Sequence, residues 1–263
     1  MKEEGVFDLS GKVALVTGAS SGLGRTFCEA VAEFGADVAV AYNTDEKGAQ
    51  ETASLVRNLG RHVLVVKVDV TKPDEVQHMI DTTIAELGTL DILINNAGFG
   101  TSPAKVHETK IEDWDKIMAI NLRGAFLCMR AALPIMIKQK KGCIINISSS
   151  ASLRAREDAR GAYSVAKAGL NHLTSLAARQ YARDGIRVNC IAPGYYGVRA
   201  QLVAIWGWSK EQVEKFDEAQ ARNNPMGRVG KPDELKALVI YLASDASSYV
   251  TGQTFVADGG GTL

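Results

Sequence analysis

Seven short apolar runs alternate with longer amphipathic stretches along this chain, and that alternation constrains its fold more than any other feature. Apolar strands rich in β-branched residues suit a parallel sheet buried on both faces, and the stretches between them supply crossover helices. We therefore predict an α/β fold in which a seven-stranded parallel sheet is doubly wound, with helices on both faces. The expected strands are Val13–Val16, Val38–Ala41, Val63–Val68, Ile92–Ile94, Ile144–Ile147, Val188–Ala192 and Thr254–Val256.

Three helix start signals support this organisation. A Ser or Thr followed three residues later by an acid or amide forms a capping box at a helix N-terminus. No repeat, low-complexity tract or Pro/Ser-rich linker interrupts the 263 residues, so we predict a single domain over 1–263. The three capping-box signals are Thr71-x-x-Asp74 before a helix to about Leu87, Thr109-x-x-Glu112 before a helix from Trp114 to about Lys138, and Ser209-x-x-Gln212 before a shorter helix.

The charge balance excludes some classes of partner. The chain carries 30 Lys plus Arg and 30 Asp plus Glu, so its formal net charge is zero. This balance argues against nucleic acid or an anionic membrane surface as the main partner. No apolar run approaches the roughly 20 residues of a transmembrane helix, and the first residues lack the build of a signal peptide. We therefore expect a cytoplasmic protein without a membrane partner.

The cysteines and histidines indicate no metal site. All eight are scattered, and no C-x-x-C pair is present. Cysteines in apolar runs are more often buried thiols than disulfide partners or zinc ligands. We therefore expect free thiols, as in a reducing compartment, at Cys28, Cys128, Cys143 and Cys190.

A glycine-rich turn, Thr17-Gly18-Ala19-Ser20-Ser21-Gly22-Leu23-Gly24, follows the first expected strand and precedes a helix. Glycines at 18, 22 and 24 let backbone N–H groups approach a pyrophosphate, and the helix directs its positive end at the same place. In the first βα unit of a sheet, this turn predicts a Rossmann domain that binds a dinucleotide.

Tyr163 and Lys167 form a candidate proton-transfer pair. Residues four apart on a helix project from one face, one turn apart. A free tyrosine has a pKa of about 10, and a nearby ammonium favours the phenolate and lowers that pKa. The pair could therefore exchange a proton with a substrate near neutral pH.

Taken together, the motifs resemble the short-chain dehydrogenase/reductase family from about residue 10 to 260. Members similar to gluconate 5-dehydrogenase and glucose dehydrogenase share the start Phe7–Val13. The resemblance implies hydride transfer between a nicotinamide cofactor and a carbonyl or secondary alcohol. The matching motifs are T-G-x-x-x-G-x-G from Thr17, Asn95-Asn96-Ala97-Gly98, Asn121, the serines after the fifth strand, Tyr163-x-x-x-Lys167, Pro193-Gly194 and Asp258-Gly259-Gly260.

The family's mechanism implies roles for the matching positions. Tyr163 would be the general acid or base, Lys167 would lower its pKa and hold the nicotinamide ribose, and Ser149 would bond the substrate oxygen. Asn121 would support a water chain to Lys167. The residues implied to bind the cofactor are Gly18, Ser20, Ser21, Gly22, Leu23, Gly24, Tyr42, Asn43, Thr44, Asp69, Val70, Asn95, Ala97, Gly98, Tyr163, Lys167, Pro193 and Gly194.

Two serines compete for the catalytic position. Counted along the strand from Gly142, Ser149 matches the family's serine, whereas the usual spacing back from Tyr163 reaches Ser150. We prefer Ser149, because a strand fixes its register and a surface loop absorbs an inserted residue.

The end of the second strand bears on the cofactor. An acidic residue there bonds the ribose of NAD and repels the 2′-phosphate of NADP. This chain has Tyr42 at that point, followed by Asn43 and Thr44, as in NADPH-dependent sugar and carbonyl reductases of the family. Against this, neither Ser21 nor Asn43 is the basic residue that many NADP enzymes use, and Asp45 and Glu46 lie close by. We favour NADP(H) over NAD(H).

A segment from Tyr195 to about Asn224 matches the family's variable substrate lid. Its aromatic side chains suit stacking on a sugar, Arg199 suits a carboxylate, and packing of the lid is an equal alternative for the tryptophans. Val198 stands where the family often has a threonine that contacts the nicotinamide. We expect a sugar, polyol or sugar acid as substrate. The aromatic residues are Tyr195, Tyr196, Trp206 and Trp208.

Long helices at Trp114–Lys138 and Ala162–Arg183 match those that pair between subunits in the family, so a homotetramer is expected. Three alternative functions stay open: a 3-ketoacyl thioester reductase, an epimerase or dehydratase with tightly bound NAD, and a non-catalytic dinucleotide-binding sensor.

Overall fold

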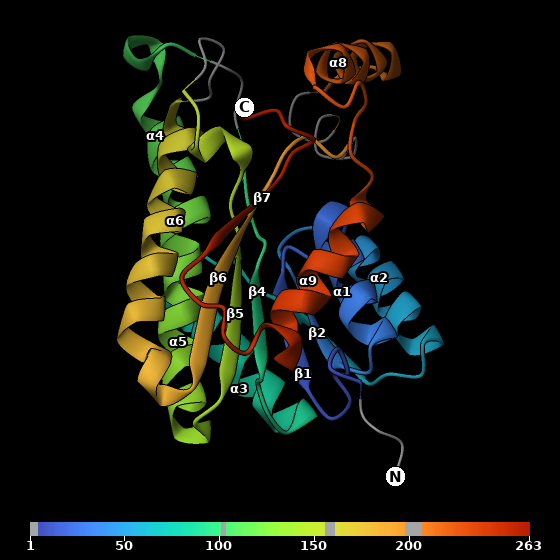
Figure 1. The fold of residues 1–263 in the computed structure, drawn as a ribbon, viewed down its shortest axis with the longest axis vertical. Coiled ribbons are helices and arrows are strands. Elements are labelled where there is room, and N and C mark those ends of the chain that lie inside the picture. Colours follow the sequence, from blue (N-terminus) through green and yellow to red (C-terminus); the bar gives the residue numbers. More distant parts are fainter. Residues whose placement is uncertain (1–4, 101–103, 156–160, 198–202, 204–206) are drawn as a thin grey trace.

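The computed structural model describes residues 5–100, 104–155, 161–197, 203 and 207–263, and within them it contains one seven-stranded sheet (Figure 1). All neighbouring strands are parallel, in the order β3-β2-β1-β4-β5-β6-β7. The parallel α/β prediction is confirmed. The strands are β1 (Val13–Thr17), β2 (Asp37–Tyr42), β3 (Val63–Lys67), β4 (Ile92–Asn95), β5 (Gly142–Ile147), β6 (Ile186–Pro193) and β7 (Thr254–Ala257).

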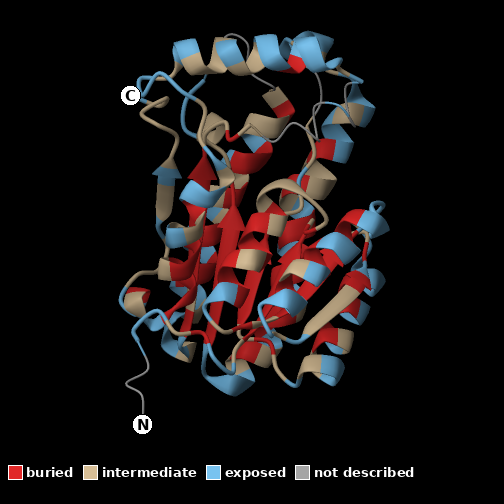
Figure 2. Ribbon diagram, turned by 90° about the vertical axis from the view of Figure 1, so that its right-hand side faces the viewer, coloured by how far each residue is buried: buried red, intermediate tan, exposed pale blue. Residues whose placement is uncertain are grey.

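Helices cover both faces of the sheet, as expected (Figure 1). One face packs against α1 (Gly22–Glu33), α2 (Glu46–Asn58) and α9 (Lys236–Ala243). The other packs against α3 (Pro73–Leu87), α5 (Ala125–Gln139) and α6 (Gly161–Tyr181), and α4 (Ile111–Met118) lies beside α6. The central strands are almost wholly buried (Figure 2), which explains their near-continuous apolar sequence.

The strand order reverses between β1 and β4, and this point locates the candidate site. The chain leaves β1 toward β2 on one side, and β4 starts the other half of the sheet. In open α/β sheets, ligands bind outside the carboxyl ends of the strands at such a reversal. The loops after β1, β2, β4 and β5 therefore all lie at the end of the sheet where such a ligand would bind.

The helix expected to run without a break from Trp114 to Lys138 is divided. A π-helical turn, Ala119–Gly124, separates α4 from α5. Asn121 lies in this turn, and its side-chain amide donates to the carbonyls of Ile117 (3.0 Å) and Phe99 (2.7 Å). The sequence pattern could not show this, because Phe99 belongs to the loop after β4.

Only one of the three expected capping boxes forms. Ser209 caps α8 (Lys210–Asn223), where its hydroxyl accepts from Gln212 N and Gln212 accepts from Ser209 N. Thr71 instead donates to Asp69 (2.8 Å), and Thr109 donates to the carbonyl of Lys105 (3.0 Å). These two hydroxyls are engaged upstream, so α3 and α4 begin without a side-chain cap.

No apolar run of membrane-spanning length was expected from the sequence, and the helical run Ile111–Gln139 differs from that expectation. It is 29 residues long and, by length and composition alone, apolar enough to cross a membrane. Half of its most apolar part is buried inside the protein, as in a core helix, which makes it weak support for a membrane span.

Candidate active site

The loops after β1 and β4 are joined by a pair of polar side chains. Asn96 donates from its amide nitrogen to the carbonyls of Thr17 (2.9 Å) and Gly18 (3.0 Å). In return, the Thr17 hydroxyl accepts from the backbone N–H groups of Asn96 (3.1 Å) and Ala97 (3.0 Å). Gly18 has φ +63°, and a Cβ there would lie 2.9 Å from Ala97 Cα. The glycine-rich turn is therefore held against the end of β4.

The N-terminus of α1 fits a pyrophosphate. The first backbone N–H groups of a helix have no intrahelical partner. In α1 these belong to Gly22, Leu23 and Gly24. Ser21 precedes them without capping them through its side chain, and the first turn contains no acidic residue. The positive end of the helix is thus open to an anion.

Past β2, the chain leaves the core abruptly. Tyr42 is 8% exposed, and its burial, followed by the charge of Glu46, raises its pKa. Asn43 and Thr44 are exposed. Asp45 caps α2, because its carboxylate accepts from Gly48 N (2.9 Å). At the carboxyl end of β2, the exposed side chains that a cofactor could contact are therefore those of Asn43 and Thr44, and not the Tyr42 ring.

Arg25 joins the glycine-rich turn to α2. Its guanidinium donates to the carbonyls of Ser20 (2.7 Å) and Gly48 (3.1 Å) and pairs with Glu51 (3.0 Å). A cation therefore lies beside the turn, although no motif singled it out in the sequence.

Asp69 and Asn95 make contacts within the protein. Asp69, after β3, accepts from the backbone and hydroxyl of Thr71. The next residue, Val70, is 8% exposed. Asn95 is 4% exposed and donates to Asn146 on β5 (2.9 Å). The Asn95 side chain thus stabilises the sheet, and its buried Oδ1 has no partner among the described residues.

Lys167 lies on α6, 3% exposed, with its ammonium donating to the carbonyl of Ile147 at 2.8 Å. Burial lowers its pKa from 10.5 to about 8. Among the described residues, no carboxylate lies within 4 Å of its ammonium. The Tyr163 ring centroid is 5.7 Å from Lys167 Nζ. The expected proximity of this pair is therefore present.

Asn121 and Gly98 adjoin this lysine. Asn121 is 1% exposed, and its Oδ1 accepts from Phe99 N at 3.2 Å. A Cβ placed on Gly98 would lie 3.1 Å from Asn121 Oδ1 and 3.7 Å from Lys167 Nζ. The loop after β4, the π-helical turn and α6 thus meet at one point.

The serine run after β5 turns toward the same helix. Ser148 is buried, and its hydroxyl donates to the carbonyl of Lys167 (3.1 Å). Ser149 caps the 3₁₀ turn η3 (Ser150–Ser152), with its hydroxyl accepting from Ala151 N at 3.2 Å. Because η3 packs on α6, Ser149 is held close to the helix that carries Tyr163.

The Pro193-Gly194 pair lies at the carboxyl end of β6, where its backbone is hydrogen-bonded to the end of β7. Gly194 N donates to Ala257 O (2.9 Å), and a Cβ on Gly194 would lie 2.8 Å from Asp258 Cα. Only glycine therefore fits this approach of two backbones.

The aromatic residues of the expected lid that the structure describes make two kinds of contact: one packs on the sheet domain, and the others contact α8. Tyr196 is buried and donates to Ala257 O (2.9 Å). Tyr195 donates to Asp217 on α8 (2.6 Å), and Trp208 packs edge-on against Phe216 at 5.3 Å. Packing, the alternative kept open above, accounts for Trp208. Val198, Arg199 and Trp206 lie outside the described residues.

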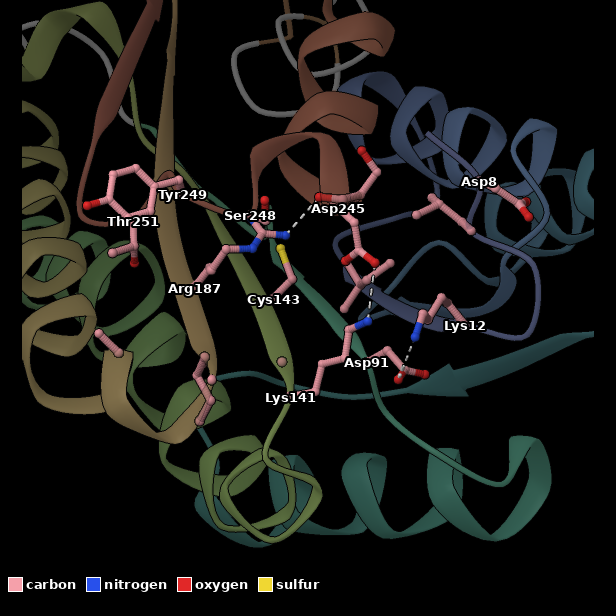
Figure 3. Close-up of a pocket in the computed structure, with 18 residues that line it drawn as sticks. Asp8, Lys12, Asp91, Lys141, Cys143, Arg187, Asp245, Ser248, Tyr249 and Thr251 are labelled. Atoms are coloured by element: carbon pink, nitrogen blue, oxygen red, sulfur yellow. Dashed lines mark hydrogen bonds and ion pairs between the residues drawn. The ribbon is translucent and has the colours of Figure 1, made fainter. Parts of the chain in front are cut away.

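A separate cavity of about 500 Å³ lies at the opposite, amino end of the strands (Figure 3). Its charged side chains are satisfied within the protein: Lys12 pairs with Asp91 (3.9 Å) and Lys141 with Asp245 (3.4 Å). Arg187 donates to the carbonyls of Leu242 and Ser244 and to Ser247 Oγ. None of the residues expected in the active site lines this cavity.

Two residues of the sequence motifs, Thr17 and Asn96, hold the loops after β1 and β4 together, although the sequence implied no individual role for either. Both lie inside the quoted T-G and N-N-A-G motifs, so a signal for them was present. Their reciprocal bonds become visible only when β1 and β4 are neighbours.

Comparisons with known proteins show relatives over nearly the whole chain. A family model described as enoyl-(acyl carrier protein) reductase matches residues 18–262. Glucose 1-dehydrogenase 2 of Bacillus subtilis (strain 168) is 38% identical over 257 residues, which cover 97% of this chain and 96% of that protein.

Two solved structures are also similar. A short-chain type dehydrogenase/reductase from Mycobacterium marinum superposes with a TM-score of 0.89, at 36% identity and full coverage of both chains. A gluconate 5-dehydrogenase from Burkholderia cenocepacia J2315, in complex with NADP and tartrate, gives 0.88 at 34% identity, with 98% of both chains covered. Since these matches span nearly the whole sequence, this chain belongs to the short-chain dehydrogenase/reductase family and is an oxidoreductase that acts on CH–OH groups.

Proposed function

We propose that this enzyme interconverts a secondary alcohol and a carbonyl on a sugar, polyol or sugar acid, with NADP(H) preferred over NAD(H). The observation that carries the proposal is the buried Lys167 beside Tyr163 on α6, at the carboxyl edge of the sheet. The names of relatives that act on glucose and gluconate support the substrate class.

In this proposal, the chain's own residues move a proton and stabilise charge. Tyr163 exchanges a proton with the substrate oxygen, and the Lys167 ammonium favours the tyrosinate. Ser149 donates to the substrate oxygen, on which charge changes during the reaction. Asn121 holds the loop after β4 against the π-helical turn and supports solvent access to Lys167. A bound nicotinamide dinucleotide supplies or accepts the hydride.

The NADP(H) preference rests on the end of β2. The Asp45 carboxylate is partly engaged within the protein, because one of its oxygens caps α2 by accepting from Gly48 N. Exposed Asn43 and Thr44 offer donors, and Arg25 adds a cation near Ser20. Measuring kcat/KM with both cofactors tests this preference, and a strong preference for NAD would refute it.

We also propose the assembly and setting expected from the sequence: a single catalytic domain over 1–263, a substrate lid at about 195–224, a cytoplasmic location and a homotetramer. Half-exposed apolar side chains on α5 and α6, among them Phe126, Val165 and Leu176, support association through these helices. A stable monomer in light scattering would exclude the tetramer.

A substrate panel followed by absorbance of the reduced nicotinamide tests the reaction. It should include D-glucose, D-gluconate, several polyols and acetoacetyl thioester, each with both cofactors. Turnover of a sugar or sugar acid is expected. A preference for the thioester would favour the 3-ketoacyl reductase alternative, and binding without any turnover would favour the sensor.

A further inference from the structure

Two polar side chains next to the proposed site have no role in the mechanism above: Ser152 and Asn171. Asn171 lies on α6, one helical turn beyond Lys167 and on the same side of the helix. Its amide nitrogen donates to Ser152 Oγ at 2.8 Å. Ser152 Oγ in turn donates to the carbonyl of Ser149 at 2.6 Å. Two hydrogen bonds therefore connect the helix of Tyr163 to the peptide group of Ser149.

Both ends of this connection are fixed. Asn171 Oδ1 accepts from the thiol of Cys190 on β6 at 3.4 Å, and Cys190 is fully buried. The Ser149 carbonyl accepts a second bond from Ser152 N at 3.0 Å. The Asn171 amide is held from one side by the sheet, and Ser152 holds the Ser149 peptide by two bonds.

Ser149 Oγ keeps its own hydrogen for another partner. Within the described part of the chain it makes one side-chain hydrogen bond, as the acceptor from Ala151 N. Its O–H is thus available to donate. Because Ser152 holds the Ser149 carbonyl by two bonds, the orientation of the Ser149 backbone is constrained, and with it the direction of Cβ and the reach of Oγ.

Ser150 lacks this support. Among the described residues, its carbonyl accepts only from Leu153 N, and its hydroxyl makes no side-chain hydrogen bond. The connection from α6 therefore distinguishes between the two serines that the sequence left in competition.

We propose that Ser152 and Asn171 are positioning residues that hold Ser149 in line with the substrate oxygen. This inference rests on the proposed role of Ser149 in the reaction. Misplacing a reacting group by about 1 Å can lower a rate by about a hundredfold. Since loss of Ser152 Oγ removes one of the two bonds to the Ser149 carbonyl, we expect a smaller effect, about tenfold on kcat.

A double-mutant cycle tests the proposal, with the panel substrate that gives the highest turnover as the probe. Ser152→Ala should lower kcat about tenfold when Ser149 is present. In the Ser149→Ala background it should lower kcat by less than about twofold, because the relay of hydrogen bonds from Asn171 through Ser152 acts only on Ser149. Ser152→Thr, which retains the hydroxyl, should restore most of kcat. Nucleotide affinity should stay unchanged in each variant.

Asn171→Asp supplies an independent variant of the same size. Its carboxylate offers Ser152 an acceptor in place of a donor and competes with the Ser149 carbonyl for the Ser152 hydrogen, so a similar loss of kcat is expected. The matched control is Ser175→Ala on the next turn of α6, where the hydroxyl bonds the carbonyls of Asn171 and Gly252 but not the serine turn. It should retain wild-type kcat.

An equal loss in both backgrounds, or wild-type kcat in Ser152→Ala, would overturn the proposal. Full activity of Ser149→Ala would also overturn it, because nothing would remain for the relay to position. The proposed reaction itself would survive that result if Tyr163→Phe abolished turnover, so the two failures can be distinguished.

Discussion

Lysines at the carboxyl ends of the strands (the carboxyl edge) and at their amino ends (the amino edge) have opposite environments. At the carboxyl edge, Lys167 is 3% exposed and bonds a neutral carbonyl. At the amino edge, Lys12 and Lys141 keep 30% and 53% of their side chains exposed, and each pairs with an aspartate. Exposed ion pairs change stability by little, whereas a buried charge without a counterion is costly. The costly arrangement occurs where the proposed chemistry takes place.

Removal of the Tyr163 hydroxyl should have the largest effect. Tyr163→Phe should lower kcat about a thousandfold, because it deletes the proposed proton donor. Tyr181→Phe, near the other end of α6, is the matched control and should keep wild-type activity. Steady-state kinetics on the best panel substrate measures both. If Tyr163→Phe kept a tenth of the activity, the carboxyl edge would lose its proposed role.

The serine pair should show the next largest effect. Ser149→Ala should lower kcat about a hundredfold, because it removes a donor to the substrate oxygen. Ser150→Ala should cost less than about threefold in the same assay. A larger loss of kcat in Ser150→Ala than in Ser149→Ala would make Ser150 the donor to the substrate oxygen. Only Tyr163 and Lys167 would then distinguish the carboxyl edge from the amino edge.

Lys167→Met should lower activity more than tenfold and yet stabilise the fold. Its pKa falls from 10.5 to about 8 on folding, a penalty of about 3 kcal/mol. The variant is relieved of this penalty but loses the hydrogen bond to Ile147 O, which costs about 1 to 2 kcal/mol. We therefore expect its free energy of unfolding at pH 7 to be about 1 to 2 kcal/mol higher than that of the wild type. Urea unfolding of both proteins measures it.

The sign of this effect with pH follows from the lowered pKa. Below about pH 8 the lysine is protonated in both states and the penalty is complete. As pH rises from about 8 to 10.5, the folded state loses the proton first, so wild-type stability recovers relative to Lys167→Met. A stability difference that stayed constant over this range would contradict the account.

The smallest effect is expected at the amino edge. Lys141→Met removes an exposed partner of Asp245 and should change the free energy of unfolding by less than about 0.5 kcal/mol, with activity unchanged. The same urea titrations provide the measurement. A loss as large as several kcal/mol would show that the amino edge depends on its ion pairs.

The sequence predicted the sheet well, because strand patterns are local and the T-G, N-N-A-G and Y-x-x-x-K motifs keep their spacing. It could not predict features that depend on distant partners. The π-helical turn at Asn121 requires Phe99, and the bonds of Thr71 and Thr109 replaced two expected helix caps.

The relay from Asn171 to Ser149 was equally invisible in the sequence. It depends on contacts that Asn171 on α6 makes with the serine turn and with β6, and each contact joins residues 19 apart in the sequence. The burial of Lys167 likewise follows from the packing of α6 on β5 and β6, and not from the motif that names it.

At the carboxyl ends of the strands, Lys167 is buried, and no acidic side chain in the described part of the chain pairs with it. Titration of its ammonium by NMR, with isotope-labelled lysine and assignment by Lys167→Met, tests that claim directly. We predict a pKa of about 8 for the Lys167 ammonium. A pKa at the ordinary lysine value of 10.5 would contradict it.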